Sequence, residues 1–282
     1  MPLVFAAIAP HGGLAIEAAC SPEERQLAAA TRAGMVELGR LFAAARPQAV
    51  IVATPHNVHL PASMGVIVSG RVAGQLAGAP PSIALDVPTE LTLAWLLLKA
   101  LLTAGVPSSG ISFGGNDPAE AVAPMDWGVL IPLWFMGGRS QPPVPVVVMT
   151  PARDLSAEAH IKAGVAVAEA AGESGLRVAF IASADHGHAH DPQGPYGFDA
   201  AAKQYDELIC GLVRHDQLDL LANLPRELVE RAKADSWWQM LILHGATRDG
   251  WRGRLLSYEA PTYFGMLTAA YVPGRVPARK RR

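Results

Sequence analysis

Short apolar runs alternate with longer segments of helical pattern along most of this chain. Four of these runs are continuous and are bounded by turn-forming residues, at 3–9, 49–53, 144–150 and 177–182. Such runs predict strands that are buried on both faces. Weaker β patterns cover residues 64–69, 82–87, 129–133 and 255–272.

Helical patterns fill the stretches between the strands. Ser21 and Pro22 are residue types that favour the N-cap and the first turn, so a helix is predicted from there to about residue 45. Further helices are predicted at 89–104, 156–171, 199–214 and 235–244. The alternation of strand and helix predicts an α/β fold with a mostly parallel central sheet and helices on both faces.

The composition indicates one folded domain. Half of the 282 residues are hydrophobic and 17% are charged, which provides a sizeable core and argues against disorder. No repeat, linker or shift in composition divides the chain, so residues 1–273 are predicted to form a single domain. Residues 274–282 form a basic tail, which is expected to be a solvated terminus. The net charge of -2 argues against a general nucleic-acid binder.

The cysteines and the apolar segments restrict the class further. Cys20 and Cys210 are far apart and in no CxxC pattern, which argues against a disulfide framework and a zinc-thiolate site. The apolar N-terminal run is too short for a membrane span and lacks a basic flank. The run at 91–102 is also short and contains Trp95 and Lys99. A cytoplasmic protein without a membrane partner is the expectation.

Two histidines directly follow predicted strands. His11 follows the first strand and His56 the second, and each is preceded by a proline. The carboxyl ends of strands form the ligand crevice in open α/β sheets, so these two imidazoles are candidates to share a metal. A single histidine in such a turn is more often a hydrogen-bonded structural residue.

Two further features carry candidate chemistry. His186, His188 and His190 alternate in a loop after the strand at 177–182, which indicates either a metal-binding tract or a solvated polar turn. Glu259 lies among apolar and aromatic residues. A carboxylate is costly to bury there unless it is paired or binds a metal, and an outward-facing strand residue is the alternative.

Five short motifs occur in a particular order along the chain: PHGG, TPHNVHLP, MDWGVLIPL, SADHGH and YEAPTYFGM. Together they resemble the class III extradiol ring-cleavage dioxygenases, the family of the protocatechuate 4,5-dioxygenase β subunit. The resemblance implies that His11, His56 and Glu259 bind Fe(II) as a facial triad of two histidines and one carboxylate. It also implies that His188 is the catalytic acid/base, and that Asp126 supports the site.

The implied reaction is cleavage of a catechol-type or aminophenol-type ring with O2 to a ring-opened semialdehyde. Many relatives have Asp-His-Gly where this chain has Asp126, Trp127 and Gly128. Trp127 cannot accept a proton from a hydroxyl but can stack on an aromatic ring. His59, Tyr196 and His186 are the other candidates for contact with the substrate.

Three alternatives stay open at this point. The first is a Memo-like relative that is not a dioxygenase. Proteins of the Memo type resemble the same pattern with a cysteine as third ligand, so Glu259 favours the dioxygenase. A zinc hydrolase on the same ligands is a second alternative. A subunit role in a larger complex is a third, although a homo-oligomer is the default expectation.

Overall fold

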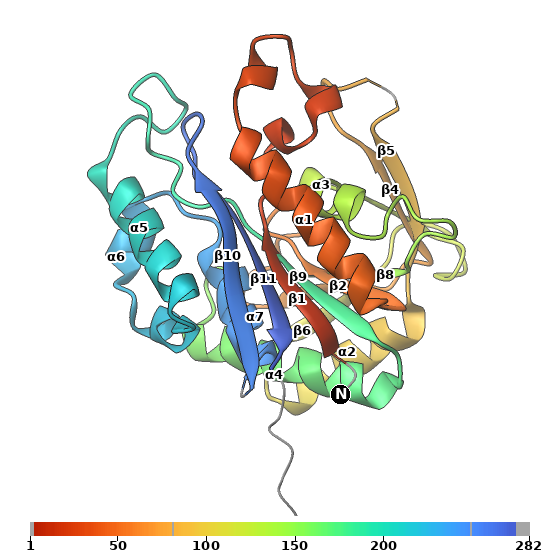
Figure 1. Ribbon diagram of the computed structural model, residues 1–282. Coiled ribbons are helices and arrows are strands. Elements are labelled where there is room, and N and C mark those ends of the chain that lie inside the picture. Colours follow the sequence, from red (N-terminus) through yellow and green to blue (C-terminus); the bar gives the residue numbers. More distant parts are fainter. Residues whose placement is uncertain (1–2, 81, 249, 275–282) are drawn as a thin grey trace, which may run out of the picture.

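The computed structural model describes residues 3–80, 82–248 and 250–274, and its centre is an eight-stranded sheet (Figure 1). The strand order is β10-β11-β1-β9-β2-β8-β3-β6. The four middle strands run parallel: β1 (Leu3–Ala9), β9 (Val178–Ser183), β2 (Ala49–Ala53) and β8 (Val146–Thr150). Nearly all of their residues are buried, as expected for strands covered on both faces.

Antiparallel pairs flank the parallel centre. β11 (Met266–Pro273) runs antiparallel to β1, and β10 (Trp251–Glu259) forms the edge beyond it. On the other side β3 (Met64–Ile67) runs antiparallel to β8, and β6 (Ser108–Ile111) is parallel to β3. A separate three-stranded sheet contains β5 (Ala84–Pro88), β4 (Arg71–Gln75) and β7 (Val122–Pro124).

Each face of the central sheet has its own hydrophobic core. Ile51 of β2 points into one core, whereas Val50 and Val52 point into the other, because side chains alternate along a strand. The Ile51 core is shared with α2 (Leu91–Thr103), α4 (Ala157–Ser174), α5 (Ala200–Arg214), α6 (Arg226–Arg231) and α7 (Trp237–Ala246). The second core is covered by α1 (Ala29–Ala45), α3 (Trp127–Phe135) and the small sheet. The predicted single-domain α/β fold with helices on both faces is confirmed.

The first helix begins later than the sequence suggested. Ser21 Oγ accepts a hydrogen bond from Glu24 N, and the Glu24 carboxylate accepts one from Ser21 N. This reciprocal pair closes a short 3-10 turn at Glu24–Gln26 rather than the start of a long helix. Ala28 then adopts a left-handed conformation with φ of 55°, and α1 starts at Ala29. The predicted start at residue 22 was therefore wrong.

The predicted strand at 129–133 was also wrong, because the segment is part of helix α3. Asp126 is the N-cap of this helix and accepts a hydrogen bond from Val129 N. The core-facing run Val129–Leu133 is entirely apolar and buried, so its sequence carries no period that separates helix from strand.

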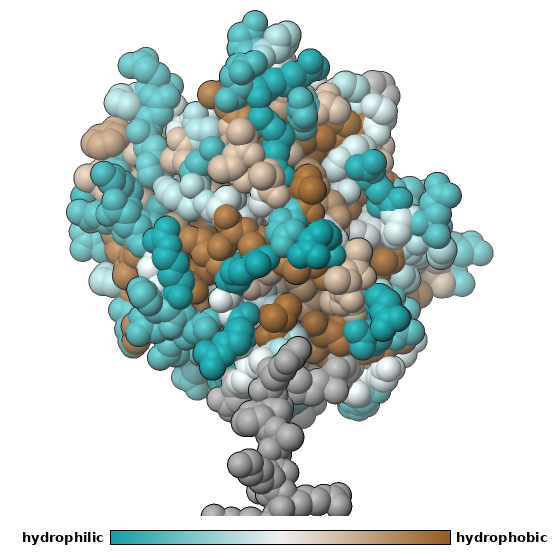
Figure 2. All heavy atoms as spheres, viewed as in Figure 1, coloured by the Kyte–Doolittle hydropathy of each residue, from teal (hydrophilic) through white to brown (hydrophobic). Residues whose placement is uncertain are grey.

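The surface seen in Figure 2 shows apolar side chains in patches between hydrophilic ones. A groove between α1 and β10 is lined by Ala30, Ala33, Leu255 and Leu256 together with Glu37 and Arg254. None of the described residues that line this groove is a histidine, so it is distinct from the histidine-containing strand ends. Within the described residues, none of the helices combines the length and apolarity needed to cross a membrane. The expected basic tail lies outside the described residues from position 275 onward.

Candidate metal centre

The carboxyl ends of β1 and β2 bring His11 and His56 together. Strand β9 lies between these two strands, yet the loops after β1 and β2 converge above it. The Nε2 atoms of the two rings are 3.0 Å apart, and the ring planes are nearly perpendicular at 88°. His11 is buried and His56 is partly exposed. The two imidazoles therefore lie side by side in the tertiary structure, as the sequence predicts.

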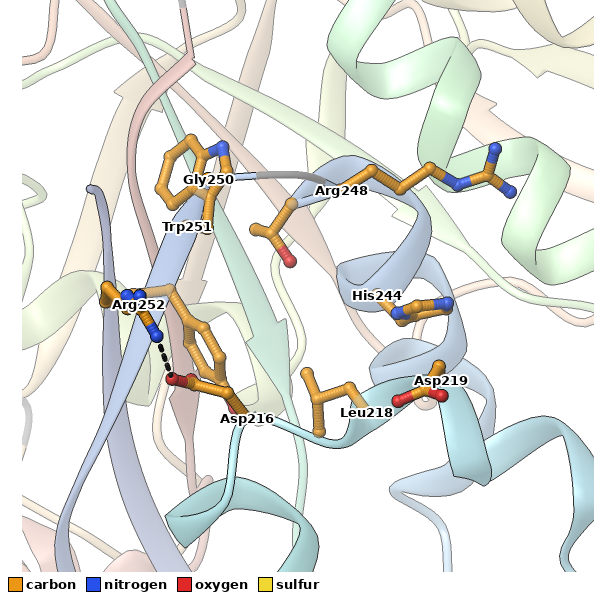
Figure 3. Close-up of a pocket in the computed structure, with 10 residues that line it drawn as sticks. Asp216, Leu218, Asp219, His244, Arg248, Gly250, Trp251 and Arg252 are labelled. Atoms are coloured by element: carbon orange, nitrogen blue, oxygen red, sulfur yellow. Dashed lines mark ion pairs between the residues drawn. The ribbon is translucent and has the colours of Figure 1, made fainter. Parts of the chain in front are cut away.

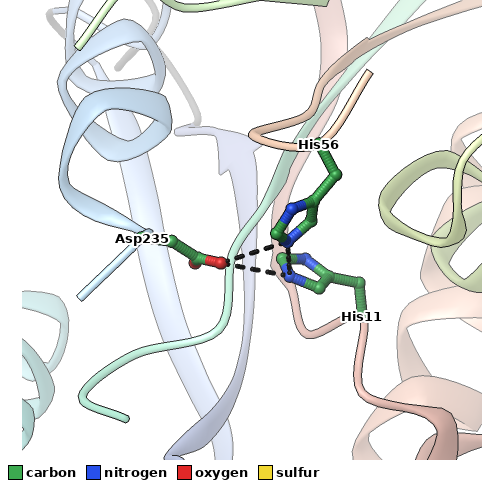
Figure 4. Close-up of side chains that lie close together, drawn as sticks. All are labelled: His11, His56 and Asp235. Carbon is green, nitrogen blue, oxygen red and sulfur yellow. Dashed lines mark hydrogen bonds and ion pairs between the residues drawn. The ribbon is translucent and has the colours of Figure 1, made fainter. Parts of the chain in front are cut away.

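Asp235 completes the cluster (Figure 4). It lies just before α7, and its Oδ2 is 3.4 Å from His11 Nε2 and 3.2 Å from His56 Nε2. Each of the three side chains offers one ligand atom, and these atoms all lie within 4.8 Å of one another. Two imidazoles and one carboxylate thus point at a common position.

The spacing of these atoms fits a bound transition metal. Nitrogen and carboxylate ligands lie about 2.0–2.2 Å from such ions. Two ligands at right angles around one ion are then about 3.0 Å apart, and two at a tetrahedral angle about 3.4 Å. The three measured separations of 3.0, 3.2 and 3.4 Å fall in this range. Within the described residues, Oδ1 of Asp235 is buried without a hydrogen-bond partner, which fits a carboxylate that binds a cation.

Ser183 sets the orientation of the His11 ring. Its Oγ donates a hydrogen bond to the Gly128 carbonyl, so the hydroxyl is an acceptor toward His11 Nδ1 at 3.0 Å. In its neutral form the His11 ring therefore carries its proton on Nδ1, and the lone pair of Nε2 faces the cluster. A hydrogen bond to the far nitrogen is the usual way in which proteins orient a metal-binding imidazole.

Two buried carboxylates give the cluster a negative field. Burial alone would lower the pKa of His11, but Asp185 and Asp235 outweigh it and raise this pKa to about 9. The Oδ2 of Asp185 is 3.4 Å from His11 Nε2, and its Oδ1 accepts a hydrogen bond from His11 N. Burial raises the pKa of Asp185, against the effect of His11. The site therefore favours a positive charge, which a proton or a metal ion can supply.

The loop that carries His56 is fixed by Asp126. The Asp126 carboxylate accepts hydrogen bonds from Thr54 Oγ1 at 2.9 Å and from Asn57 Nδ2 at 2.9 Å, in addition to capping α3. A Cβ at Gly128 would collide with the hydroxyl of Thr54, so this close approach requires glycine. Trp127 stacks on His56 with ring centroids 4.4 Å apart. Asp126 thus has the supporting role that the sequence implied, and Trp127 stacks on a protein ring.

Glu259 lies away from the two histidines. It is on the edge strand β10, and β11 separates β10 from β1. Its carboxylate accepts a hydrogen bond of 2.6 Å from Thr31 N, in the first turn of α1. That helix has no side-chain cap of its own, so Glu259 satisfies an unpaired N–H and places a negative charge at the positive end of the helix. The expected third ligand is therefore replaced in the cluster by Asp235.

His188 lies beside the cluster rather than in it. Its Nδ1 donates a hydrogen bond of 2.7 Å to the carbonyl of His186, which leaves Nε2 unprotonated in the neutral ring. The ring stacks on Phe264 at 5.4 Å and meets the Tyr196 ring edge-on at 5.8 Å. His188 lines a cavity of about 530 Å³ together with His56, Asp235 and Tyr196. An imidazole with a free Nε2 thus faces the same space as two of the three cluster residues.

The other candidate residues are more scattered. His186 is fully buried, neither of its ring nitrogens has a partner among the described residues, and burial lowers its pKa to about 4. His190 donates to the buried Asp206 at 2.8 Å, which ties its loop to α5. His59 is exposed and lines neither cavity beside the cluster. Of the four expected substrate contacts, Tyr196 and Trp127 line these cavities, and His59 and His186 do not.

A second cavity, of about 750 Å³, reaches the cluster from the side of His11. Its walls include Trp127, Phe264 and Tyr263. The cluster therefore has one hollow on the side of His56 and Asp235, and another on the side of His11.

A third cavity, of about 340 Å³, has a different character (Figure 3). It contains one histidine, His244, and an ion pair of 3.6 Å between Arg252 and Asp216. Tyr271 in its wall pairs with Ala6 of β1, several residues before His11, so this cavity lies toward the opposite end of the sheet. One imidazole does not make a metal site, and this cavity is not part of the candidate centre.

The role of Asp235 is hard to predict from the sequence. An aspartate just before an apolar helix is usually an N-cap, and in the predicted helix at 235–244 it is only the first residue. In the structure Ser236 is the N-cap residue, and α7 has no side-chain cap. An acidic residue followed by the almost wholly buried helix Trp237–Ala246 was the available signal.

Comparison with known proteins places the chain in a family. Residues 5–268 match the family model described as the catalytic LigB subunit of aromatic ring-opening dioxygenase. The chain belongs to this family. A curated relative, Protein CA_C1420 of Clostridium acetobutylicum, is 21% identical over 253 residues, which are 89% of this chain and 53% of the relative. The chain thus spans about half the length of that relative.

A solved structure shares the fold. The crystal structure of the uncharacterized protein JW3007 from Escherichia coli K12 superposes with a TM-score of 0.59 at 17% identity. The match covers 95% of this chain and 99% of the other. At this identity the likeness shows the fold of the chain and not its activity.

Proposed function

We propose that this protein is an Fe(II)-dependent extradiol dioxygenase that opens the ring of a catechol-type or aminophenol-type aromatic with O2. The observation that carries the proposal is the spacing of 3.0–3.4 Å among the ligand atoms of His11, His56 and Asp235. Two histidines and one carboxylate are the donor set of the facial triad typical of non-haem Fe(II) oxygenases. The chain also belongs to a family whose description is the catalytic subunit of an aromatic ring-opening dioxygenase, which supports the dioxygenase function.

The residues of the chain would hold and shield the ion. His11 and His56 would bind it through Nε2, and Asp235 through Oδ2. A bound Fe(II) ion supplies coordination positions for the diol and O2, and the electron transfer that ring opening needs. Ser183 keeps the His11 lone pair directed at the ion, and Asp126 keeps the His56 loop in place.

His188 would move the protons of the reaction. Its Nδ1–H is held by the His186 carbonyl, so Nε2 is the atom that accepts a proton from a substrate hydroxyl. The same nitrogen can later return that proton to an oxygen of the opened ring. An imidazole does both near neutral pH because its ordinary pKa is about 6.5.

The test is oxygen uptake by the chain after anaerobic loading with Fe(II), using a panel of catechols and 2-aminophenols. We expect iron at about one per chain, uptake with at least one substrate, and the absorbance of a ring-opened semialdehyde. The His11→Ala variant should lose iron and uptake together, whereas His215→Ala, a change at an exposed histidine, should keep both. A chain that binds iron in full but consumes no O2 with any of these substrates contradicts the proposal.

Zinc hydrolysis is the second candidate, because the separation of 3.4 Å also suits a tetrahedral ion. Metal analysis of the protein purified without added metal distinguishes the two. Zinc retained against excess Fe(II), together with ester or amide hydrolysis and no O2 uptake, would favour the hydrolase.

A further inference from the structure

The hollow on the side of His11 has mainly apolar walls. It measures about 750 Å³, which is within the range of cavities that bind small molecules. Its apolar lining includes Leu14, Ala19, Leu76, Met125, Ile131 and Phe264. Most of these side chains are buried, so the walls belong to the core beneath the small sheet and α3.

This hollow begins at the candidate metal centre. His11 is part of its wall, and so are the rings of Trp127 and Phe264. Trp127 stacks on His56 at 4.4 Å, and Phe264 stacks on His188 at 5.4 Å. An aromatic diol held at the cluster would therefore have this hollow directly beside its ring.

Among the described residues, no lysine or arginine lines the hollow, and its one imidazole, His11, is directed at the cluster, so an anionic substituent would find no free counter-charge there. The two carboxylates in its wall already have donors. Asp126 accepts hydrogen bonds from Thr54, Asn57 and Val129 N, and Glu24 accepts one from Ser21 N. Burial of an apolar group is favoured by such walls, whereas burial of an unpaired charge is costly.

We propose that this hollow takes a bulky apolar substituent of the diol, such as a second aryl ring or an alkyl chain. The inference rests on the proposed function, since it takes the diol to be held at His11, His56 and Asp235. It makes Ala19 and Ala79, on different segments of the wall, determinants of substrate choice. Ala19 ends a 3-10 turn after His11, and Ala79 lies in the connection between β4 and β5.

The hollow on the side of His56 and Asp235 is lined by cations and would suit an anionic substituent. Arg153, Arg226 and Lys233 line the 530 Å³ cavity, and all three side chains are exposed. Arg153 stacks on Trp238 at 4.9 Å. Water already solvates these cations, so they gain less from an anionic substituent than the buried apolar wall gains from an aryl ring. Preference for an anionic substituent is thus the rival outcome of the test.

The variants fill the apolar hollow from two directions. Ala19→Phe and Ala79→Phe each add a ring to its wall. Ala18→Phe is the matched control, since Ala18 is the exposed neighbour of Ala19 and lines no part of the hollow. Circular dichroism and iron content identify any variant that fails to fold, and the two filling variants provide independent tests.

The experiment measures both binding and turnover. Calorimetry on the Fe(II)-loaded protein without O2 compares catechol, 3-phenylcatechol, 4-phenylcatechol and 3,4-dihydroxybenzoate, and oxygen uptake gives kcat/KM for each. We expect at least one phenylcatechol to exceed catechol about tenfold or more in affinity and in kcat/KM, as apolar pockets typically discriminate. Both filling variants should remove this advantage, whereas Ala18→Phe should retain it and leave kcat/KM for catechol within about twofold of wild type.

The outcomes separate this inference from the proposed function. Equal affinity for catechol and both phenylcatechols, a clear preference for 3,4-dihydroxybenzoate, or an advantage that survives both filling variants would overturn the inference, even if O2 is consumed. Selective binding of a phenylcatechol that both filling variants abolish, without any O2 uptake, would uphold the hollow as an apolar subsite and refute the dioxygenase function.

Discussion

The hydroxyl of Ser183 lies 3.0 Å from Nδ1 of His11 and donates its own proton to the Gly128 carbonyl. This arrangement fixes the protonated nitrogen of His11 on the side away from the cluster. Ser183 is the last residue of β9, the strand between those that carry the two histidines. A residue that touches no ligand atom thus determines which nitrogen is available.

We predict that Ser183→Ala lowers the affinity for Fe(II) by about 10–100-fold, the usual effect of losing such a supporting hydrogen bond. Competition with a coloured chelator measures this change. Ser69→Ala is the control, because Ser69 is equally buried but bonds to Ser112 away from the site. Unchanged affinity in Ser183→Ala would mean that the ring orientation does not depend on this bond.

Asp235 and Glu259 should respond differently to neutralisation. Asp235→Asn removes the charge facing both imidazoles and is expected to weaken metal binding by more than about 100-fold. Glu259→Gln should bind metal normally. It weakens a charged contact with the first turn of α1, so the free energy of unfolding should fall by about 0.5–1 kcal/mol.

Metal titration gives the metal affinity of each variant, and urea denaturation gives its free energy of unfolding. If Glu259→Gln lost the metal and Asp235→Asn kept it, the cluster would not be the binding site.

His188 is expected to act on turnover and not on metal binding. His188→Gln should retain iron but lower kcat by about 10²–10⁴-fold, the usual contribution of a general acid/base. Tyr196→Phe keeps an aromatic ring in the same cavity and should lower kcat by less than about tenfold. Stopped-flow absorbance at the product wavelength gives both values. A His188→Gln enzyme with nearly full activity would exclude the proton-transfer role.

The buried His160 should make stability depend on pH. Burial lowers its pKa to about 4 from the 6.5 expected in the unfolded chain. The unfolded state therefore binds more protons between these values, and stability falls as pH decreases from about 6.5 toward 4. At pH 5 the loss from this one group is about 2 kcal/mol.

Urea denaturation at pH 7.5 and pH 5 measures the effect. His160→Leu removes the group, so the variant should gain about 2 kcal/mol relative to wild type between the two pH values. In the described part of the chain, His160 Nε2 has no partner, and Nδ1 donates to the Ser156 carbonyl. Parallel changes in the two proteins would show that His160 does not titrate in this window.

The sequence by itself determined the parts of the fold that depend on local pattern. The four central strands have buried apolar runs, and Ser156 and Asp199 cap their helices as their residue types predict. Where local pattern was ambiguous, the prediction was wrong: the apolar run in α3 has no period, and the signal at Ser21 closes a short turn.

The sequence also placed His11 and His56 at one edge of the sheet, because both follow strands of the same parallel layer. The third member of the cluster depended on contacts that no local pattern encodes. Glu259 is turned toward α1 because its strand is at the sheet edge, and Asp235 reaches the histidines because α7 packs on β9. Residues adjacent along the chain share a pattern, but residues from different layers meet only through packing, and that decided the candidate metal centre.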